Sequence, residues 1–197
     1  WHQNTRFPVI QMDASAWMKT RGGENVSKAF VIIGCHRSAT SLTAKALHDQ
    51  SNVEWVAESM VNESNKHGHW ENAELIALND RILAAARGKW YKPPTVKAID
   101  KVADKFTAEM ERVIRTLSND GKAAIWGMKD PRMVLTWQIF RPIVETLSDD
   151  IHVFFQVRAM ERNDASLKER SPQLKIDWPG LARLYRERML YLLAREP

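Results

Sequence analysis

The segment from Ala29 to Leu42 restricts the possible folds of this chain more than any other segment. Residues 30–33 are a short apolar run, typical of a strand that is buried on both faces. The run ends at Gly34, a loop of small and polar residues follows, and residues 41–48 have the pattern of a helix. A loop between a buried strand and a helix N-terminus presents backbone N–H groups to phosphate oxygens. The segment therefore predicts a phosphate-binding cradle.

The cradle differs from an ATP-binding P-loop, whose pattern is Gly-x-x-x-x-Gly-Lys-Ser/Thr. Counted from Gly34, the second glycine position holds Ala39. The next two positions hold Thr40, where the lysine is needed, and Ser41. The missing lysine would reach the β- and γ-phosphates of a nucleoside triphosphate. The positive charge of this loop lies earlier, at Arg37, so the pattern favours a phosphate ligand other than ATP.

Two more apolar runs, at 123–127 and 151–157, predict two further buried strands. Apolar residues at helical spacing predict helices over 71–87, 101–117, 133–147 and 178–194, and 158–170 is predicted to contain a loop and a helix. Strands that alternate with helices indicate an α/β fold of three layers, with a mostly parallel sheet flanked by helices. Ligands bind such sheets beyond the carboxyl ends of the strands, where the loops 35–41, 128–132 and 158–166 are expected.

Composition limits the class of protein. A length of 197 residues fits one domain, and no apolar run approaches the roughly 18 residues of a membrane span. The net charge is +5, but the basic residues are dispersed, which favours a polyanionic small ligand over nucleic acid. Cys35 is the only cysteine, so no intrachain disulfide can form. With no visible signal segment, this favours a cytoplasmic location.

Two motifs resemble those of sulfotransferases that use PAPS (3′-phosphoadenosine 5′-phosphosulfate). The string Arg37-Ser-Ala-Thr-Ser-Leu42 resembles the Lys/Arg-Ser-Gly-Thr-Thr/Ser loop that grips the 5′-phosphosulfate in that family. The family binds the 3′-phosphate with an Arg at a strand end and a Ser eight residues later. Here Arg158 directly follows the third predicted strand, and Ser166 lies eight residues on. Met160 stands where the family commonly has proline.

Two further motifs are similar to those of bacterial sulfotransferase-like proteins. Gly127-Met-Lys-Asp-Pro-Arg132 contains their Lys-Asp-Pro-Arg loop. Gly68-His-Trp-Glu-Asn72, followed by Leu78-Asn-Asp80, is similar to their Gly-Tyr-Phe/Trp-Glu and Leu-Asn-Asp elements. The four matches together span residues 29–170.

The resemblance implies a P-loop NTPase-like sulfotransferase architecture in a single domain over 1–197, with residues 1–28 as an N-terminal extension. The family continues with a further strand and helices after a segment like 178–195, so we expect the C-terminal part of the domain to be truncated. It also implies PAPS as cofactor, with PAP as product, no metal, and sulfuryl transfer to a hydroxyl or amine of a small-molecule or glycan acceptor.

The resemblance assigns roles to named residues. The expected cofactor-binding residues are Arg37, Ser38, Ala39, Thr40, Ser41, Arg158 and Ser166. Arg37 is also expected to stabilise the leaving phosphate, and Lys129, in the loop after the second strand, to bridge the sulfuryl group or the leaving oxygen. The base that deprotonates the acceptor is expected to be Glu58, which has the family spacing from the loop arginine, with Glu71 next and His69 third.

Other interpretations stay open from the sequence. A nucleotide or small-molecule kinase is the first alternative, and a non-catalytic nucleotide-binding relative of the fold is the second. Lys129, Asp130 and Arg132 fit a structural ion network as well as a site, and Arg132 fits either acceptor binding or a pair with Asp130.

Overall fold

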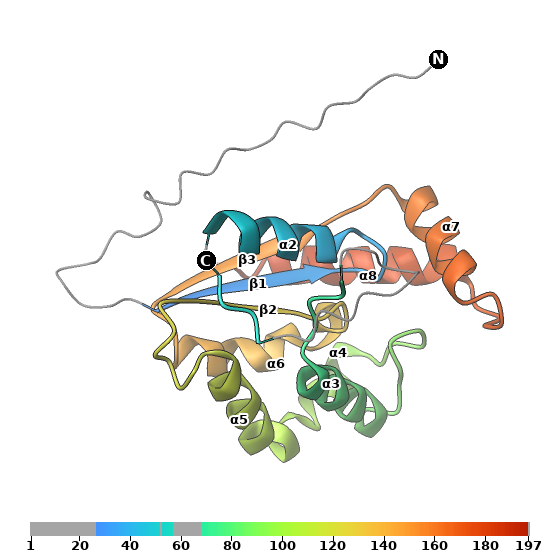
Figure 1. Ribbon diagram of the computed structural model, residues 1–197. Helices are drawn as coiled ribbons and strands as arrows, with labels where there is room; N and C mark the ends of the chain where they lie inside the picture. Colours follow the sequence, from blue (N-terminus) through green and yellow to red (C-terminus); the bar gives the residue numbers. More distant parts are fainter. Residues whose placement is uncertain (1–26, 52, 57–67, 197) are drawn as a thin grey trace.

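The fold is described by a computed structural model for residues 27–51, 53–56 and 68–196. Three parallel strands form the sheet: β1 (Lys28–Gly34), β2 (Ile125–Lys129) and β3 (Asp150–Gln156). Their order is β2-β1-β3, so β1 is the central strand and pairs with both others. Because all three run in one direction, their carboxyl ends meet at one edge of the sheet (Figure 1). The chain is thus an α/β protein with a small parallel sheet flanked by helices, as predicted.

Helices connect the strands and follow the last of them. They are α2 (Thr40–Ser51), α3 (Ala73–Ala85), α4 (Val96–Asp100), the 3-10 helix η1 (Ala103–Phe106), α5 (Thr107–Leu117), α6 (Met133–Glu145), α7 (Met160–Arg170) and α8 (Trp178–Leu193). No helix in these described parts of the chain is long and apolar enough to cross a membrane.

Some element boundaries in the structure differ from the sequence predictions. The single helix expected over 101–117 is instead η1 and α5, and a separate short helix, α4, lies directly before them. The Thr95 hydroxyl accepts a hydrogen bond from the Ala98 N–H at 3.2 Å, which starts a helix earlier than the apolar spacing indicates. Lys129, expected in a loop, is the last residue of β2 and pairs in register with Ile32, because the sheet ladder continues through it.

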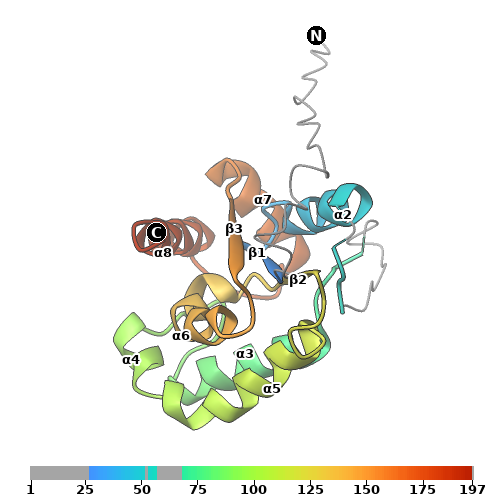
Figure 2. The same cartoon turned by 90° about the vertical axis from the view of Figure 1, so that its left-hand side faces the viewer.

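The two faces of β1 pack on different cores. Ala29, Val31 and Ile33 belong to a large core cluster with residues of α3, α5, α6 and α8, while Phe30 and Ile32 pack with Ala44 and Leu47 of α2. Figure 2 shows α2 on the side of the sheet opposite to α3, α5 and α6. Burial on both faces explains why the strand is a continuous apolar run rather than an alternating one.

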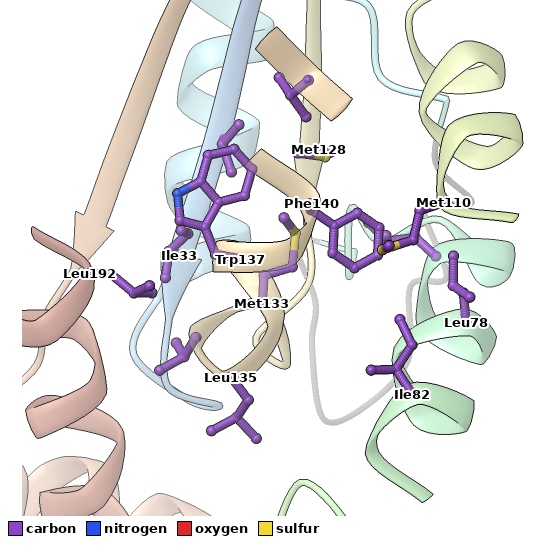
Figure 3. Close-up of a cluster of buried hydrophobic side chains, with 14 of the residues drawn as sticks. Ile33, Leu78, Ile82, Met110, Met128, Met133, Leu135, Trp137, Phe140 and Leu192 are labelled. Atoms are coloured by element: carbon purple, nitrogen blue, oxygen red, sulfur yellow. The ribbon is translucent and has the colours of Figure 1, made fainter. Parts of the chain in front are cut away.

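Helix α6 supplies much of the large core cluster. Figure 3 shows its Met133, Trp137 and Phe140 packed among Ile33 of β1 and Leu78 of α3. This packing fixes the start of α6 directly after the carboxyl end of β2. The turn that joins β2 to α6 is therefore held between two well-packed elements.

Candidate functional site

The loop after β1, residues 35–39, folds back over the end of its own strand, and Gly34 makes this possible. A Cβ atom at Gly34 would lie 2.7 Å from the Ser38 hydroxyl and 2.8 Å from the Gln156 carbonyl oxygen. Both distances are shorter than side chains tolerate. The first glycine of the cradle pattern is therefore required by the close approach of the loop to β1 and β3.

The loop backbone exposes N–H groups at the start of α2. Arg37 and Ala39 both have left-handed backbone conformations, with φ of 67° and 72°. The Ser38 N–H and hydroxyl both donate to the Cys35 carbonyl, at 3.1 and 2.7 Å, so Ser38 shapes the loop from within. Within the described residues, no acceptor is bonded to the N–H groups of Ala39 and Thr40. At the N-terminus of a 12-residue helix, two such donors suit an anion.

Three predicted cofactor-binding residues meet at the first half of the loop. The Arg37 Nε donates to the Ser166 hydroxyl at 2.9 Å, and the Arg158 Nη1 donates to the Arg37 carbonyl oxygen at 2.9 Å. We call Arg37, Arg158 and Ser166 the arginine cluster. Its members come from the β1 loop, the end of β3 and helix α7, and 121 residues separate its two arginines. Two guanidinium groups and a hydroxyl at one place are well suited to phosphate oxygens.

The far end of the cradle is held by a buried lysine. The Lys129 side chain is 1% exposed. Its Nζ donates to the Ser41 hydroxyl at 3.1 Å, the His69 carbonyl oxygen at 2.7 Å and the Glu71 Oε1 at 2.5 Å. We call Ser41, His69, Glu71 and Lys129 the lysine cluster. An ammonium group has three donors, and these contacts hold the Lys129 side chain at the end of the cradle.

The lysine cluster contains two of the three predicted bases, Glu71 through its carboxylate and His69 through its backbone carbonyl. The Glu71 Oε1 pairs with Lys129, while its Oε2 has no hydrogen-bond partner in the part of the chain that the structure describes. The side chain is 15% exposed, so a ligand can approach it. His69 contributes its carbonyl oxygen to the cluster. Glu58, the first choice from sequence, lies outside the described residues.

The Asp130 carboxylate is fully buried and lies at the centre of a polar network. Its Oδ2 accepts from the Asn79 amide at 2.9 Å, and its Oδ1 accepts from the backbone N–H and Nη1 of Arg132, both at 3.0 Å. The Arg132 Nε donates to Asp80 at 2.7 Å. We call these four residues the aspartate network. Arg132 therefore pairs with Asp130, which was one of the two roles left open by the sequence.

The electrostatics of this network follow from burial and pairing. Burial raises the pKa of Asp130, and the Arg132 guanidinium opposes that rise. Burial by itself would lower the pKa of Arg132, but Asp130 and Asp80 raise it overall, so Arg132 stays charged. The network joins the Leu78-Asn-Asp80 motif of α3 to the turn after β2. It thereby fixes the position of Lys129 at the end of that strand.

Cys35 contributes no reactive thiolate to the cradle. Its side chain is buried, and burial raises the pKa of the thiol to about 12, so it is uncharged near neutral pH. Across residues 27–51, 53–56 and 68–196, no group of three or more His, Cys, Asp or Glu side chains is placed to hold a metal ion.

The sequence prediction missed two polar residues of this site. Asn163 of α7 donates from its Nδ2 to the His36 carbonyl oxygen at 2.8 Å, which ties the cradle to the helix a second time. Asn79 holds Asp130 and accepts from the Thr136 hydroxyl at 2.6 Å. Both lie within or beside motifs noted from the sequence, three residues before Ser166 and inside Leu78-Asn-Asp80 respectively.

The chain matches no family model, no curated protein and no solved structure. The function proposed for it therefore depends on the motifs and on the geometry of the site.

Proposed function

We propose that this chain binds PAPS and transfers its sulfuryl group to a hydroxyl or amine of a small-molecule or glycan acceptor. One observation carries the proposal: Arg37 forms hydrogen bonds with both Arg158 and Ser166 at the carboxyl edge of a parallel sheet. The sequence motifs assign these residues to the two phosphate groups of one nucleotide, and a nucleotide can reach both only if they are close.

In this proposal the cradle binds the 5′-phosphosulfate. The free N–H groups of Ala39 and Thr40 and the Arg37 guanidinium face the phosphate that becomes the leaving group. Arg158 and the Ser166 hydroxyl bind the 3′-phosphate. Negative charge grows on the leaving phosphate as its bond to sulfur breaks, so the donors that hold it also stabilise the transition state.

The acceptor is deprotonated by Glu71 in this scheme. The acceptor oxygen or nitrogen attacks sulfur in line with the leaving phosphate oxygen, the bond from sulfur to that oxygen breaks, and the acceptor proton passes to the Glu71 Oε2. Lys129 holds the Glu71 Oε1 and the Ser41 hydroxyl, so it positions the base relative to the cradle. Glu58 remains a predicted alternative base.

The first test is a calorimetric titration of the chain with PAP, AMP, ADP and ATP–Mg²⁺. PAP differs from AMP only in its 3′-phosphate, so we expect PAP to bind at least tenfold more tightly than AMP. Equal affinity for PAP and AMP would contradict the proposal, because no 3′-phosphate would be recognised. Preference for ATP–Mg²⁺ with ATP-dependent turnover would favour the kinase alternative instead.

Substitutions in the arginine cluster test which residues recognise the 3′-phosphate. Arg158→Ala and Ser166→Ala should each weaken PAP binding, by about tenfold or more for the arginine, while AMP binding changes little. Arg162→Ala is a matched control, because this arginine is exposed and lies on α7, four residues after Arg158 and on the same helix as Ser166. A loss of PAP affinity in Arg162→Ala as large as in Arg158→Ala would show a general charge effect and contradict the assignment.

The base is tested by Glu71→Gln, which keeps the size of the side chain and removes the proton acceptor. We expect PAP affinity to stay within about threefold and sulfuryl transfer to fall by 10²–10⁴-fold, the usual contribution of a general base. The measurement is transfer of labelled sulfate from PAPS to a panel of phenols, sugars and amines. Unchanged turnover would move the base to Glu58 or His69. PAP binding without transfer to any acceptor would favour the non-catalytic alternative.

A further inference from the structure

A small cavity lies beside the cradle, between the loop after β1, the end of β3 and the helices α7 and α8. Its volume is about 20 Å³, and its lining includes Cys35, Ser38, Arg158, Asn163, Arg186 and Met189. A cavity of this size holds one group as large as a water molecule. It is too small for a nucleobase or a phosphate, so any ligand atom inside it belongs to a hydroxyl, an amine or a similar small group.

Asn163, which lines this cavity, carries an acceptor that lacks a donor. The residue is 3% exposed, and its Nδ2 donates to the His36 carbonyl oxygen at 2.8 Å. Its Oδ1 has no hydrogen-bond partner within the described chain. A buried oxygen without a partner is unfavourable, and most such atoms in folded proteins are bonded to protein, water or ligand. A donor of the size of a hydroxyl would satisfy it.

The proposed ligand carries such a donor at the required place. Asn163 and Ser166 lie three residues apart on α7 and are therefore neighbours on one face of the helix. Arg158, which lines the cavity, belongs with Ser166 to the cluster assigned to the 3′-phosphate. The hydroxyl nearest to a 3′-phosphate on a nucleotide is the ribose 2′-hydroxyl, on the adjacent carbon atom.

The charged side chains that line the cavity are positive, which suits the phosphate groups of a nucleotide bound beside it. Arg158 and Arg186 are basic, no acidic side chain is among the described residues that line the cavity, and the Cys35 thiol is uncharged. Ser38 cannot supply the missing donor, because its hydroxyl donates to the Cys35 carbonyl.

We propose that the Asn163 Oδ1 accepts a hydrogen bond from the ribose 2′-hydroxyl of the bound nucleotide, so that the site selects ribonucleotides over 2′-deoxyribonucleotides. This inference rests on the proposed function, since it takes the 3′-phosphate to lie at Arg158 and Ser166. Asn163 is then a specificity-determining residue as well as a support for the cradle.

The test is a calorimetric titration of the full chain with PAP and with 2′-deoxyadenosine 3′,5′-bisphosphate. We expect the deoxy compound to bind about tenfold more weakly, because it leaves the buried oxygen unpaired. In Asn163→Leu, which has a side chain of similar size and no acceptor, the ratio of the two dissociation constants should fall to about one. Ser166→Ala should weaken both compounds equally and leave the ratio unchanged, because this hydroxyl is assigned to the phosphate.

The outcomes separate this inference from the proposed function. Equal binding of PAP and its deoxy analogue would overturn the inference and leave the proposed function intact. The inference would also be overturned if inosine 3′,5′-bisphosphate, which lacks the adenine amine, bound more weakly than PAP while the deoxy compound bound as tightly as PAP. The donor to Asn163 would then be the amine of the base. Failure of PAP itself to bind would overturn both. If Asn163→Leu does not fold, the comparison of the two nucleotides on the unaltered chain still decides.

Discussion

Single residues in the cradle show a conflict between local backbone preference and the shape of the loop. Ala39 has a φ of 72°, a region that costs a residue with a Cβ about 1–2 kcal/mol. The sequence comparison noted Ala39 because the loop pattern has glycine there. The structure gives the physical reason: the backbone has the conformation that glycine favours, although the side chain is alanine.

We therefore predict that Ala39→Gly increases the free energy of unfolding by about 0.5–1 kcal/mol, since relief of strain exceeds the added flexibility of the unfolded chain. Ala84→Gly is the matched control, because Ala84 is an exposed residue inside α3 and the same change there should cost about 1 kcal/mol. Urea denaturation of both variants measures the difference. If both lose stability equally, Ala39 is not held in the left-handed region in solution.

At the scale of elements, the aspartate network joins α3 to the turn between β2 and α6. Arg132 bonds Asp130 and Asp80 from within the protein, with its side chain 13% exposed. Asp130 is fully buried, so removal of Arg132 leaves a carboxylate without its cation. Breaking a buried pair in this way is far more costly than breaking a pair at the surface.

Arg132→Ala should therefore lower the free energy of unfolding by about 3–5 kcal/mol. Arg81→Ala is the matched control: Arg81 also joins two helices, through Glu109, but its side chain is 55% exposed. The control should cost less than about 1 kcal/mol. Urea denaturation measures the free energy of unfolding of both variants. Similar losses of stability in the two would mean that the aspartate network adds no stability beyond an ordinary surface pair.

Elements differ in how well the sequence predicts them. All three strands were predicted, because each contains a short apolar run, although only β1 and β2 are largely buried and β3 is partly buried along its length. The helix boundaries near residue 101 were wrong, because a cap at Thr95 starts α4 and periodicity does not contain that signal. Lys129 was placed outside its strand for a similar reason: a lysine in a buried strand requires partners, here Ser41, His69 and Glu71, that are distant in sequence.

The convergence of Arg37 with Arg158 and Ser166 was predictable for a different reason. Parallel strands bring their carboxyl ends to one edge, so topology alone brings the loops after β1 and β3 together. The contacts of Asn163 and Asn79 were not predictable, because they depend on how the helices rotate and pack against the cradle. Periodicity indicates which face of a helix is buried but not which atom that face meets.

At the scale of the whole molecule, the site lies between parts that are anchored unequally. The cradle is anchored by β1, the central strand of the sheet. In α7, among the residues whose side chains the structure describes, Asn163 and Leu167 are the buried ones. The N-terminus of α7 has no side-chain cap. Two hydrogen bonds join the helix to the loop: Asn163 donates to the His36 carbonyl oxygen, and Ser166 accepts from the Arg37 guanidinium. A helix with few buried apolar side chains is expected to open more readily than the helices of the core.

A nucleotide that bridges the cradle and α7 should therefore stabilise α7 most. At a PAP concentration 100 times the dissociation constant, the bound state gains about 2.7 kcal/mol, so amides of α7 that exchange through release of the ligand should exchange about 100-fold more slowly. Hydrogen exchange followed by mass spectrometry measures this for residues 35–41 and 158–170. Peptides of α5, which packs on the large core cluster away from the cradle, are the internal control for local opening.

Saturating AMP should protect the cradle but not α7, because it has no 3′-phosphate for Arg158 and Ser166. Equal protection of α7 by AMP and PAP would mean that the helix senses occupation of the cradle and not the 3′-phosphate, and the assignment of the arginine cluster would then be wrong.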